Sequence, residues 1–173
     1  LVVCLAVLLS ISMAVKGFAE EVNAENNTLD MGLGNPAAPI NMVDYSSFTC
    51  PHCATFHSEV FPKIKEEYVD SGKVFLIFRE VYFDGPGLWA SMVARCSSRE
   101  AFFPIIDLLF RKQNDWAFAS SQIDIVNGLI SIGKQAGLSE NEVLTCMKDR
   151  PKAKELVEWF KANAIEDSVD STP

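Results

Sequence analysis

Two segments of the chain carry the apolar pattern of β-strands. Residues 40–46 (INMVDYS) and 73–81 (KVFLIFREV) are short, rich in apolar residues and flanked by turn-forming residues. The unbroken run Val74–Phe78 suits a strand that is covered on both faces, as in a parallel sheet. Because two strands do not form a stable sheet by themselves, we expect either that the short segment near residue 31 joins them or that further strands follow Pro173.

Helical periodicity accounts for most of the remaining pattern. Between the strands, a helix that kinks at Pro62 is expected over 51–69, with apolar residues about four positions apart at Phe56, Val60, Ile64 and Tyr68. From residue 88 onward we expect helices at 88–96, 100–112, 122–136, 139–148 and 151–163. A capping box at Ser139 and Glu142 and a proline at position 151 mark two of the helix starts. This order of elements predicts an α/β fold with a parallel core and a helical insertion.

The helical region also carries a series of aromatic residues. Their helical spacing predicts that they pack in the core rather than line a ligand pocket; they are Phe102, Phe103, Phe110, Trp116 and Phe118.

Composition and charge limit the classes of function. The 173 residues are 49% hydrophobic and 22% charged, which is typical of one globular domain and excludes a disordered or collagen-like chain. The 15 basic and 23 acidic residues give a formal net charge of −8, and the sequence contains no basic run. We therefore expect no nucleic-acid partner and no binding to anionic membrane surfaces.

An apolar run, LVVCLAVLLSISMAV, opens the sequence with no charge before Lys16. Its length and the small residues Gly17 and Ala19 predict a signal peptide over 1–19 and export, followed by a flexible, acidic lead-in over 20–30. An uncleaved membrane anchor is the alternative, because the run is not preceded by the charged residues of a signal peptide. Loss of the signal would remove Cys4 and leave an even number of cysteines.

The segment Phe48-Thr49-Cys50-Pro51-His52-Cys53 joins the first predicted strand to the first helix. Because Pro51 suits the first helical position, Cys50 falls at the N-cap, where free backbone N–H groups and the helix dipole favour a thiolate. Such a cysteine is a nucleophile, and His52 can add positive charge or a hydrogen bond. Cys53, one turn into the helix, suits the resolving role. The pair therefore predicts thiol–disulfide exchange that needs no metal or organic cofactor.

Two alternatives use the same cysteines as ligands. A zinc site would need His57 or the distant Cys96 and Cys146, whose spacing matches no zinc motif. A c-type haem needs a histidine where Ala54 stands. We therefore expect redox chemistry, with His57 as an ordinary residue of the helix surface.

Asp44 lies six residues before Cys50 in an otherwise apolar strand. A carboxylate that points into the core could take and return the proton that Cys53 exchanges. An acid at the strand end that reaches solvent fits the position equally well, so both interpretations stay open.

Cys96 and Cys146 form the second pair of cysteines. Cys96 lies on a helical stripe with Leu88 and Met92, and Cys146 lies beside Val143, so both are expected to face the interior of the helical region. Export favours a structural disulfide between them, worth about 4 kcal/mol on the chain-entropy model. Two buried free thiols are the alternative.

These residues are similar to those of a known family. The CPHC segment, after a strand that bears Asp44, resembles the bacterial DsbA family of periplasmic thiol:disulfide oxidoreductases, and LGNPAAPI at 33–40 resembles the lead-in of DsbA-like thioredoxin domains. The resemblance implies Cys50 as nucleophile, Cys53 as its partner and Asp44 at the position of the family's buried acid. The Cys96–Cys146 pair resembles the second, structural disulfide of alphaproteobacterial members.

The resemblance, which covers residue 31 to the end, also implies how the chain is organised. It implies a thioredoxin fold whose core occupies 31–87 and 165–173, with an inserted helical domain over 88–164. Ser171-Thr172-Pro173 resembles the start of the family's cis-proline loop, so Thr172 and Pro173 are expected to face the CPHC segment. The family's last strands and final helix would then be missing, and the chain would be a fragment.

The function that the resemblance implies is oxidation of reduced exported proteins in the periplasm. The enzyme would act as a monomer, and a DsbB-like membrane partner would reoxidise it. A disulfide reductase or isomerase on the same fold is one alternative, and a non-enzymatic zinc-binding module is another.

Overall fold

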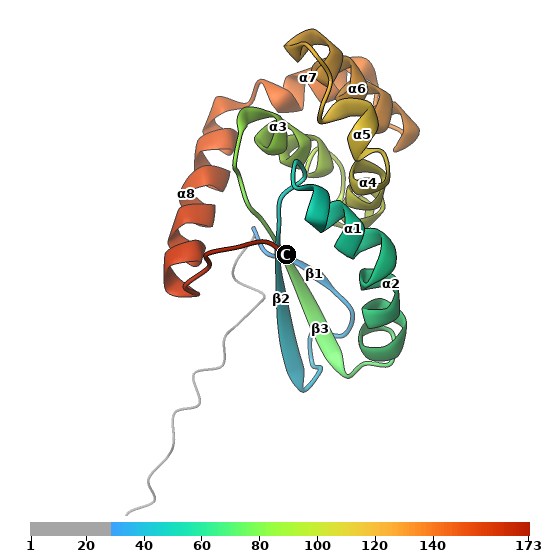
Figure 1. Ribbon diagram of the computed structural model, residues 1–173, viewed down its shortest axis with the longest axis vertical. Helices are drawn as coiled ribbons and strands as arrows, with labels where there is room; N and C mark the ends of the chain where they lie inside the picture. Colours follow the sequence, from blue (N-terminus) through green and yellow to red (C-terminus); the bar gives the residue numbers. More distant parts are fainter. Residues whose placement is uncertain (1–28) are drawn as a thin grey trace, which may run out of the picture.

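The computed structural model describes residues 29–173 (Figure 1). The predicted signal peptide over 1–19 and most of the predicted lead-in lie outside the described residues. Leu29 and Asp30, which we expected in the flexible lead-in, are both buried, so the packed part of the chain begins earlier than predicted.

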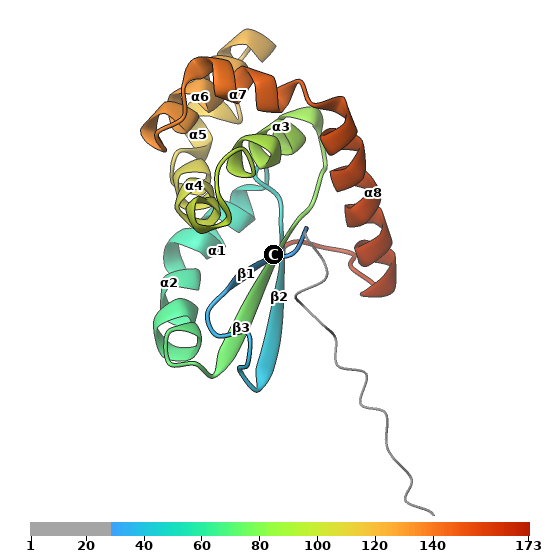
Figure 2. The same cartoon turned by 180° about the vertical axis from the view of Figure 1, so that it is seen from behind.

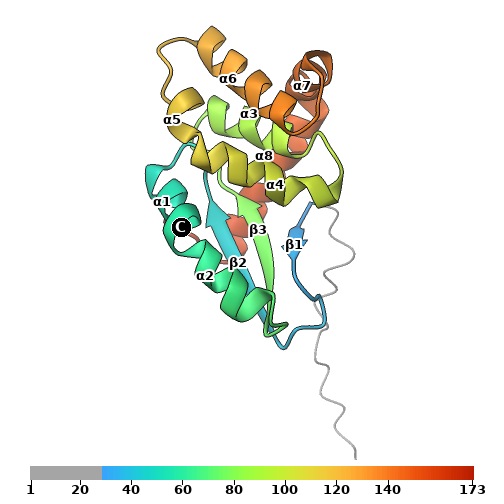
Figure 3. The same cartoon turned by 90° about the vertical axis from the view of Figure 1, so that its right-hand side faces the viewer.

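A three-stranded sheet lies at the centre of the described structure, with helices packed around it. Its strands are β1 (Met31–Leu33), β2 (Ile40–Ser46) and β3 (Val74–Glu80), in the order β1-β3-β2, with β2 parallel and β1 antiparallel to β3. Both predicted strands are confirmed. The segment near residue 31 pairs with β3, which confirms the first of the two sources expected for a third strand. The central place of β3 explains its unbroken apolar run, because helices cover both faces of the sheet (Figure 3).

The helix that follows β2 is divided into three parts. They are α1 (Pro51–Glu59), α2 (Phe61–Ile64) and a π-helical turn, η1 (Lys65–Val69). The break at Val60 comes just before Pro62, whose missing N–H prevents a continuous α-helical ladder. The predicted apolar stripe is wrong, because Val60 and Tyr68 are 44% and 45% exposed. The buried residues are instead Cys53 and His57 in α1, and Val69, which the π turn after the break buries.

The helical region begins with α3 (Gly85–Ala94), α4 (Arg99–Arg111) and the short α5 (Gln113–Trp116). It continues with α6 (Gln122–Gln135), α7 (Glu140–Met147) and α8 (Arg150–Glu166). All the predicted helices are present within a few residues of their expected bounds, the capping box at Ser139 and Glu142 is formed, and α5 is an addition. No helix within 29–173 combines the length and apolar character that crossing a membrane requires.

The helices are arranged in two groups around the sheet. Helices α3 to α7 gather beyond the end of β2 and β3, whereas α1 and α2 cover one face and α8 lies along the other (Figures 1 and 2). Along β2, alternate residues therefore meet different partners. Asp44 and its neighbour Phe78 on β3 face α1, and Tyr45 and its neighbour Arg79 face α8.

The aromatic residues of the helical region follow the core prediction with one exception. Phe102, Phe110 and Trp116 are buried and Phe103 packs against them, but Phe118 is 54% exposed and lies outside the core. Phe118 follows the end of α5 in the connection to α6, so helical spacing does not apply to it.

Candidate active site

Cys50 lies at the N-cap of α1, the predicted position. The loop that leaves β2 brings its backbone into an extended conformation, with φ −86° and ψ 118°, and Pro51 opens the helix. Cys50 is partly exposed, whereas Cys53, one turn further, is fully buried, and the two are unbonded thiols in this structure. The chain therefore offers one sulfur to solvent and keeps its partner inside.

Hydrogen bonds to the Cys50 sulfur favour its thiolate. Burial by itself would raise the pKa of Cys50, but hydrogen bonds from the Thr172 side chain, from the backbone N–H and thiol of Cys53 and from the backbone N–H of His52 outweigh it. The pKa of Cys50 is therefore held below its ordinary value. The imidazole of His52 is exposed, so the contact that His52 makes to this sulfur is the one from its backbone.

Cys53 has the opposite character. Burial raises the pKa of the Cys53 thiol to about 11, and the neighbouring Cys50 sulfur adds to the rise, although Thr172 and the backbone of Ser47 oppose it. The Ser47 N–H donates to Cys53 Sγ over 3.4 Å. At neutral pH the site thus holds a thiolate-prone cysteine next to one that keeps its proton.

The segment after α8 returns to these two cysteines. The Thr172 side chain interacts with both sulfurs, and the peptide bond between Thr172 and Pro173 is cis. The structure therefore brings Thr172 and Pro173 together with Cys50 and Cys53, residues more than a hundred positions away in the sequence.

Asp44 is buried and makes a pair with His57. Only 4% of Asp44 is exposed, its Oδ1 accepts a hydrogen bond of 2.6 Å from Ser46 Oγ, and its Oδ2 lies 3.2 Å from Nε2 of His57. Of the two interpretations of Asp44, the structure has the carboxylate that points into the core. The expectation for His57 is wrong: its ring is buried and stacks on Phe110 at 4.1 Å between centroids. The polar ring of His57 can be buried because Asp44 is its hydrogen-bond partner.

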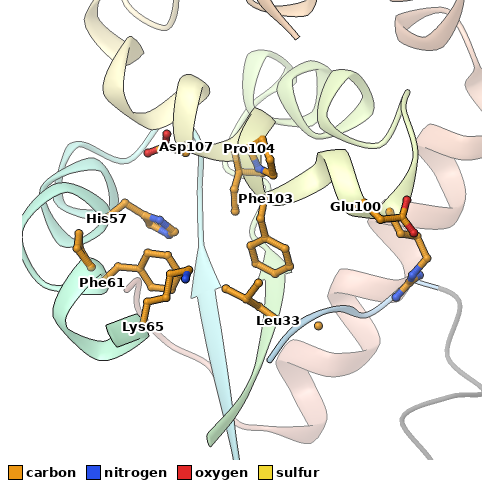
Figure 4. A pocket seen from close by; sticks show the side chains of 12 residues that line it. Leu33, His57, Phe61, Lys65, Glu100, Phe103, Pro104 and Asp107 are labelled. Carbon is orange, nitrogen blue, oxygen red and sulfur yellow. The ribbon is translucent and has the colours of Figure 1, made fainter. Parts of the chain in front are cut away.

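His57 also forms the inner wall of an open groove of about 490 Å³ (Figure 4). The groove lies between α1–α2, β1 and α4, and its apolar side chains include Leu33, Phe61 and Phe103. Asp107 and Lys65 stand at its rim. The ring of His57 therefore connects this surface with the carboxylate beneath α1.

The loop between β2 and α1, residues 47–50, is called the cysteine loop. The helical region contacts this loop at two points that were not predicted from the sequence. Gln113 of α5 is buried and its Nε2 donates to the carbonyl oxygens of Phe48 and Cys50, at 2.8 and 2.9 Å. A Cβ added at Gly87, in the first turn of α3, would lie 3.4 Å from Oγ1 of Thr49, so that turn lies directly against the loop. No local signal marked Gln113, because it lies within the polar run Arg111–Asp115.

Cys96 and Cys146 are joined by a disulfide, with their Cα atoms 5.8 Å apart. It links the turn after α3 to α7 across 50 residues of sequence. Both cysteines are only partly buried, so the expectation that they face the interior is wrong. They lie near the ends of their helices, where the helical stripe no longer decides burial.

Metal ligands are not grouped in the described part of the chain: residues 29–173 contain no cluster of three or more His, Cys, Asp or Glu side chains suited to a metal ion. His57, the zinc candidate nearest to the cysteines, is held by Asp44.

A strand that leads into a Cys-X-X-Cys helix start, together with a cis-proline segment beside the cysteines, defines the class of thioredoxin-fold dithiol proteins. Comparison with known proteins agrees. The thioredoxin family matches residues 26–173. The chain belongs to this family, on its DsbA-like branch.

Individual relatives support this placement. A Rickettsia bellii protein named "Putative protein-disulfide oxidoreductase" is 34% identical over 136 residues, which are 78% of this chain and 51% of that protein. Disulfide bond formation protein D of Bacillus subtilis is 36% identical over 90 residues, 48% of this chain and 39% of the relative. The chain thus spans about half the length, or less, of these curated relatives.

Solved structures give the same result. Wolbachia pipientis alpha-DsbA1 is 33% identical and has a TM-score of 0.77, over 84% of this chain and 73% of that one. BdbD of Bacillus subtilis, at 23% identity and a TM-score of 0.72 over 83% of this chain and 78% of that one, shares the fold.

Proposed function

We propose that this protein is a thiol:disulfide oxidoreductase that introduces disulfide bonds into exported proteins. The observation that carries the proposal is the unequal pair of thiols at the start of α1. Cys50 is accessible and has a lowered pKa, and Cys53 is buried with a pKa of about 11. A stabilised thiolate lowers the free energy of the reduced form, which makes the corresponding disulfide a stronger oxidant.

The proposed reaction has two exchange steps. In the oxidised enzyme, a substrate thiolate attacks Cys50 Sγ, the Cys50–Cys53 bond breaks, and Cys53 leaves and takes up a proton, as its raised pKa favours. A second substrate thiolate then attacks the substrate sulfur of the mixed disulfide and Cys50 leaves as a thiolate. The substrate dithiol is oxidised to a disulfide and the enzyme is reduced to its dithiol. The low pKa of Cys50 makes it the better leaving group in this step.

Seven other residues have supporting roles in this proposal. Pro51 and the backbone of His52 hold Cys50 at the helix start, and Thr172 with Pro173 lies against the two sulfurs. Asp44, buried on the β2 face that α1 covers, is the group proposed to take and return the proton that Cys53 exchanges. The disulfide between Cys96 and Cys146 has only a structural role.

Compartment and partners follow from this chemistry. We place the protein in the periplasm, where reduced exported chains are its substrates and a DsbB-like membrane protein returns the pair to the disulfide. The names of the relatives, which refer to disulfide oxidoreduction and disulfide bond formation, support this assignment. We propose that the enzyme acts as a monomer and uses no metal or organic cofactor.

The direction of electron flow is tested by the equilibrium reduction potential of the Cys50–Cys53 pair in glutathione buffers. We expect a value near or above about −180 mV, the region of oxidases and isomerases. A value near the roughly −270 mV of thioredoxin would make the protein a reductase and overturn the proposal. The variant Cys50→Ala/Cys53→Ala is the matched control, because any titration that remains belongs to the other cysteines.

Two further readouts separate the remaining alternatives. Oxidised protein mixed with a reduced, unfolded substrate should lose one disulfide for each one that the substrate gains, whereas an isomerase would rearrange substrate disulfides with no net loss of its own. Tight zinc binding by Cys50 and Cys53 without any thiol exchange would show that the pair is a ligand set and would overturn the enzymatic assignment.

A further inference from the structure

We infer that Tyr45 and Arg79 clamp Asp167 at the end of α8, and that this clamp positions Thr172 against the sulfurs of Cys50 and Cys53. The three residues are not adjacent to the cysteines and form no part of the CPHC segment. The inference rests on the proposed role of Cys50 and Cys53, and it assigns a positioning function to a polar cluster on the opposite face of the sheet.

The clamp is built from short hydrogen bonds to one carboxylate oxygen. The Tyr45 hydroxyl donates to Asp167 Oδ2 over 2.6 Å, and Nη1 of Arg79 donates to the same oxygen over 2.8 Å. Arg79 also donates to the Tyr45 oxygen over 2.8 Å, so the three groups form a closed triangle. Because Tyr45 and Arg79 are register partners on β2 and β3, they present a fixed surface to the end of α8.

A second carboxylate holds Arg79 from its other side. Asp30 accepts from Nε and Nη2 of Arg79 at 2.9 and 3.1 Å, and the guanidinium lies over the ring of Trp159 on α8 at 5.5 Å. With both ends of its fork occupied, Arg79 has a defined geometry when it meets Asp167. Hydrogen bonding to Asp30 and Tyr45 outweighs burial and raises the pKa of Arg79, which therefore stays charged.

Asp167 is the point where the chain turns from α8 toward the cysteines. It caps α8, and Ser168 follows with φ +55°, a left-handed conformation that favours glycine. The N–H groups of Ser168 and Val169 bond back to the carbonyls of Ile165 and Ala164, which completes a Schellman turn. A non-glycine residue in this conformation costs about 1–2 kcal/mol, which these two hydrogen bonds and the contacts that hold Asp167 offset together.

The clamp supplies those contacts. From Asp167 only four residues lead to Thr172, whose side chain interacts with both sulfurs. Ser168 and Asp170 in this stretch are exposed, and Asp170 accepts a bond of 3.0 Å from the adjacent Ser171. Val169, between Ser168 and Asp170, is partly buried. The hydrogen bonds of the clamp lie at the start of this stretch, at Asp167, and a shift there is passed along the short segment to the Thr172 hydroxyl.

A purely electrostatic effect of Asp167 and a positioning effect predict opposite shifts in the pKa of Cys50, which makes the inference testable. Removing the negative charge of Asp167 and freeing Arg79 would by charge alone favour the Cys50 thiolate and lower its pKa. Releasing Thr172 from Cys50 removes a hydrogen bond that stabilises the thiolate and would raise the pKa. Measuring the pKa of Cys50 from thiolate absorbance in the reduced protein therefore distinguishes the two, and it needs no substrate.

We expect Asp167→Ala to raise the pKa of Cys50, with a decrease of its acid dissociation constant by about threefold to tenfold, as loss of part of a charged hydrogen bond predicts. Asp167→Asn, which keeps an acceptor oxygen for Tyr45, should restore most of the wild-type value. Tyr45→Phe removes one side of the triangle while keeping the ring, and should shift the pKa in the same direction. Asp170→Ala is the control for charge in the same segment and should leave the pKa unchanged or lower.

A double-mutant cycle with Thr172→Val completes the test. If Asp167 acts through Thr172, Asp167→Ala should have no further effect on the pKa of Cys50 once the hydroxyl is gone. An unchanged or lowered pKa in folded Asp167→Ala and Tyr45→Phe, or an equal rise in the Thr172→Val background, would overturn the inference. Because none of these values depends on whether the pair oxidises or reduces, failure of the clamp and failure of the proposed function give different results.

Discussion

Nε2 of His57 lies 3.2 Å from Oδ2 of Asp44, and the two residues come from α1 and β2 on either side of the apolar core. Their side chains are 5% and 2% exposed, so water contributes little to either group. The imidazole is surrounded by the rings of Phe56, Phe61 and Phe110, which hold it against the carboxylate. The pair is thus the main polar contact between this helix and the sheet.

Loss of the imidazole should destabilise the fold. His57→Leu leaves Oδ2 of Asp44 buried without its partner, and we expect the free energy of unfolding to fall by about 1–3 kcal/mol. Urea unfolding of the variant and the wild type measures the difference. His52→Leu, at the exposed histidine, is the matched control and should change stability little. The double variant Asp44→Leu/His57→Leu should recover part of the loss, and no recovery would argue against an unpaired carboxylate as its cause.

The stability of the reduced protein should depend on pH through its two cysteines. Cys50 has a lower pKa folded than unfolded, so its contribution is fully present above the unfolded value of about 8.5 and is lost as pH falls through the lowered pKa. Cys53 has a raised pKa, so its contribution is present below about 8.5 and is lost as pH rises toward about 11. We expect stability relative to Cys50→Ser to increase with pH up to about 8.5. A flat difference would mean that the pKa of Cys50 is not lowered.

Gln113 should affect both stability and exchange, because its amide satisfies two carbonyl oxygens of the cysteine loop. Gln113→Leu keeps a similar volume but removes both donors, and we expect a loss of about 1–3 kcal/mol and slower reaction of Cys50 with a small disulfide. Gln135→Leu, on the exposed side of α6, is the control and should be close to neutral. Equal effects of the two substitutions would show that the contact to the loop has no special importance.

The disulfide should matter for stability and not for chemistry. Cys96→Ala/Cys146→Ala opens a loop of 50 residues, and the chain-entropy relation predicts a loss of about 4 kcal/mol in unfolding free energy. The pKa of Cys50 should not change, since the disulfide joins the turn after α3 to α7, away from the N-terminus of α1. A changed pKa would contradict a purely structural role.

Local sequence signals were sufficient for the elements and for the position of Cys50. Strands, helix starts and the N-cap at Cys50 depend on neighbouring residues, such as Pro51 after the cysteine or Glu142 three residues after Ser139. The parallel pairing of β2 with β3 also followed, because a helix between two strands returns the chain in the same direction.

The contacts around the cysteines could not be predicted in the same way. His57 looked like a surface residue because its partner Asp44 is on another element, and the apolar spacing assigned the wrong face of α1 to the sheet. Gln113 and Asp167 each depend on a tertiary contact with a distant segment, Gln113 with the cysteine loop and Asp167 with Tyr45 and Arg79. A polar residue has no local pattern that names a partner far away in the sequence.

The break at Val60 separates the helix start that stabilises Cys50 from the helical residues that shape the groove beside α4. The field at a helix start comes mainly from its first turn, so the stabilisation of Cys50 is complete before the chain reaches Val60. The residues after the break, from Phe61 onward, instead shape the groove beside α4 and pack Val69 into the core. Substitutions after Phe61, whose ring contacts His57, can therefore remodel this groove while the first turn of α1 that holds Cys50 stays the same, which makes that short segment a place for an engineer to begin.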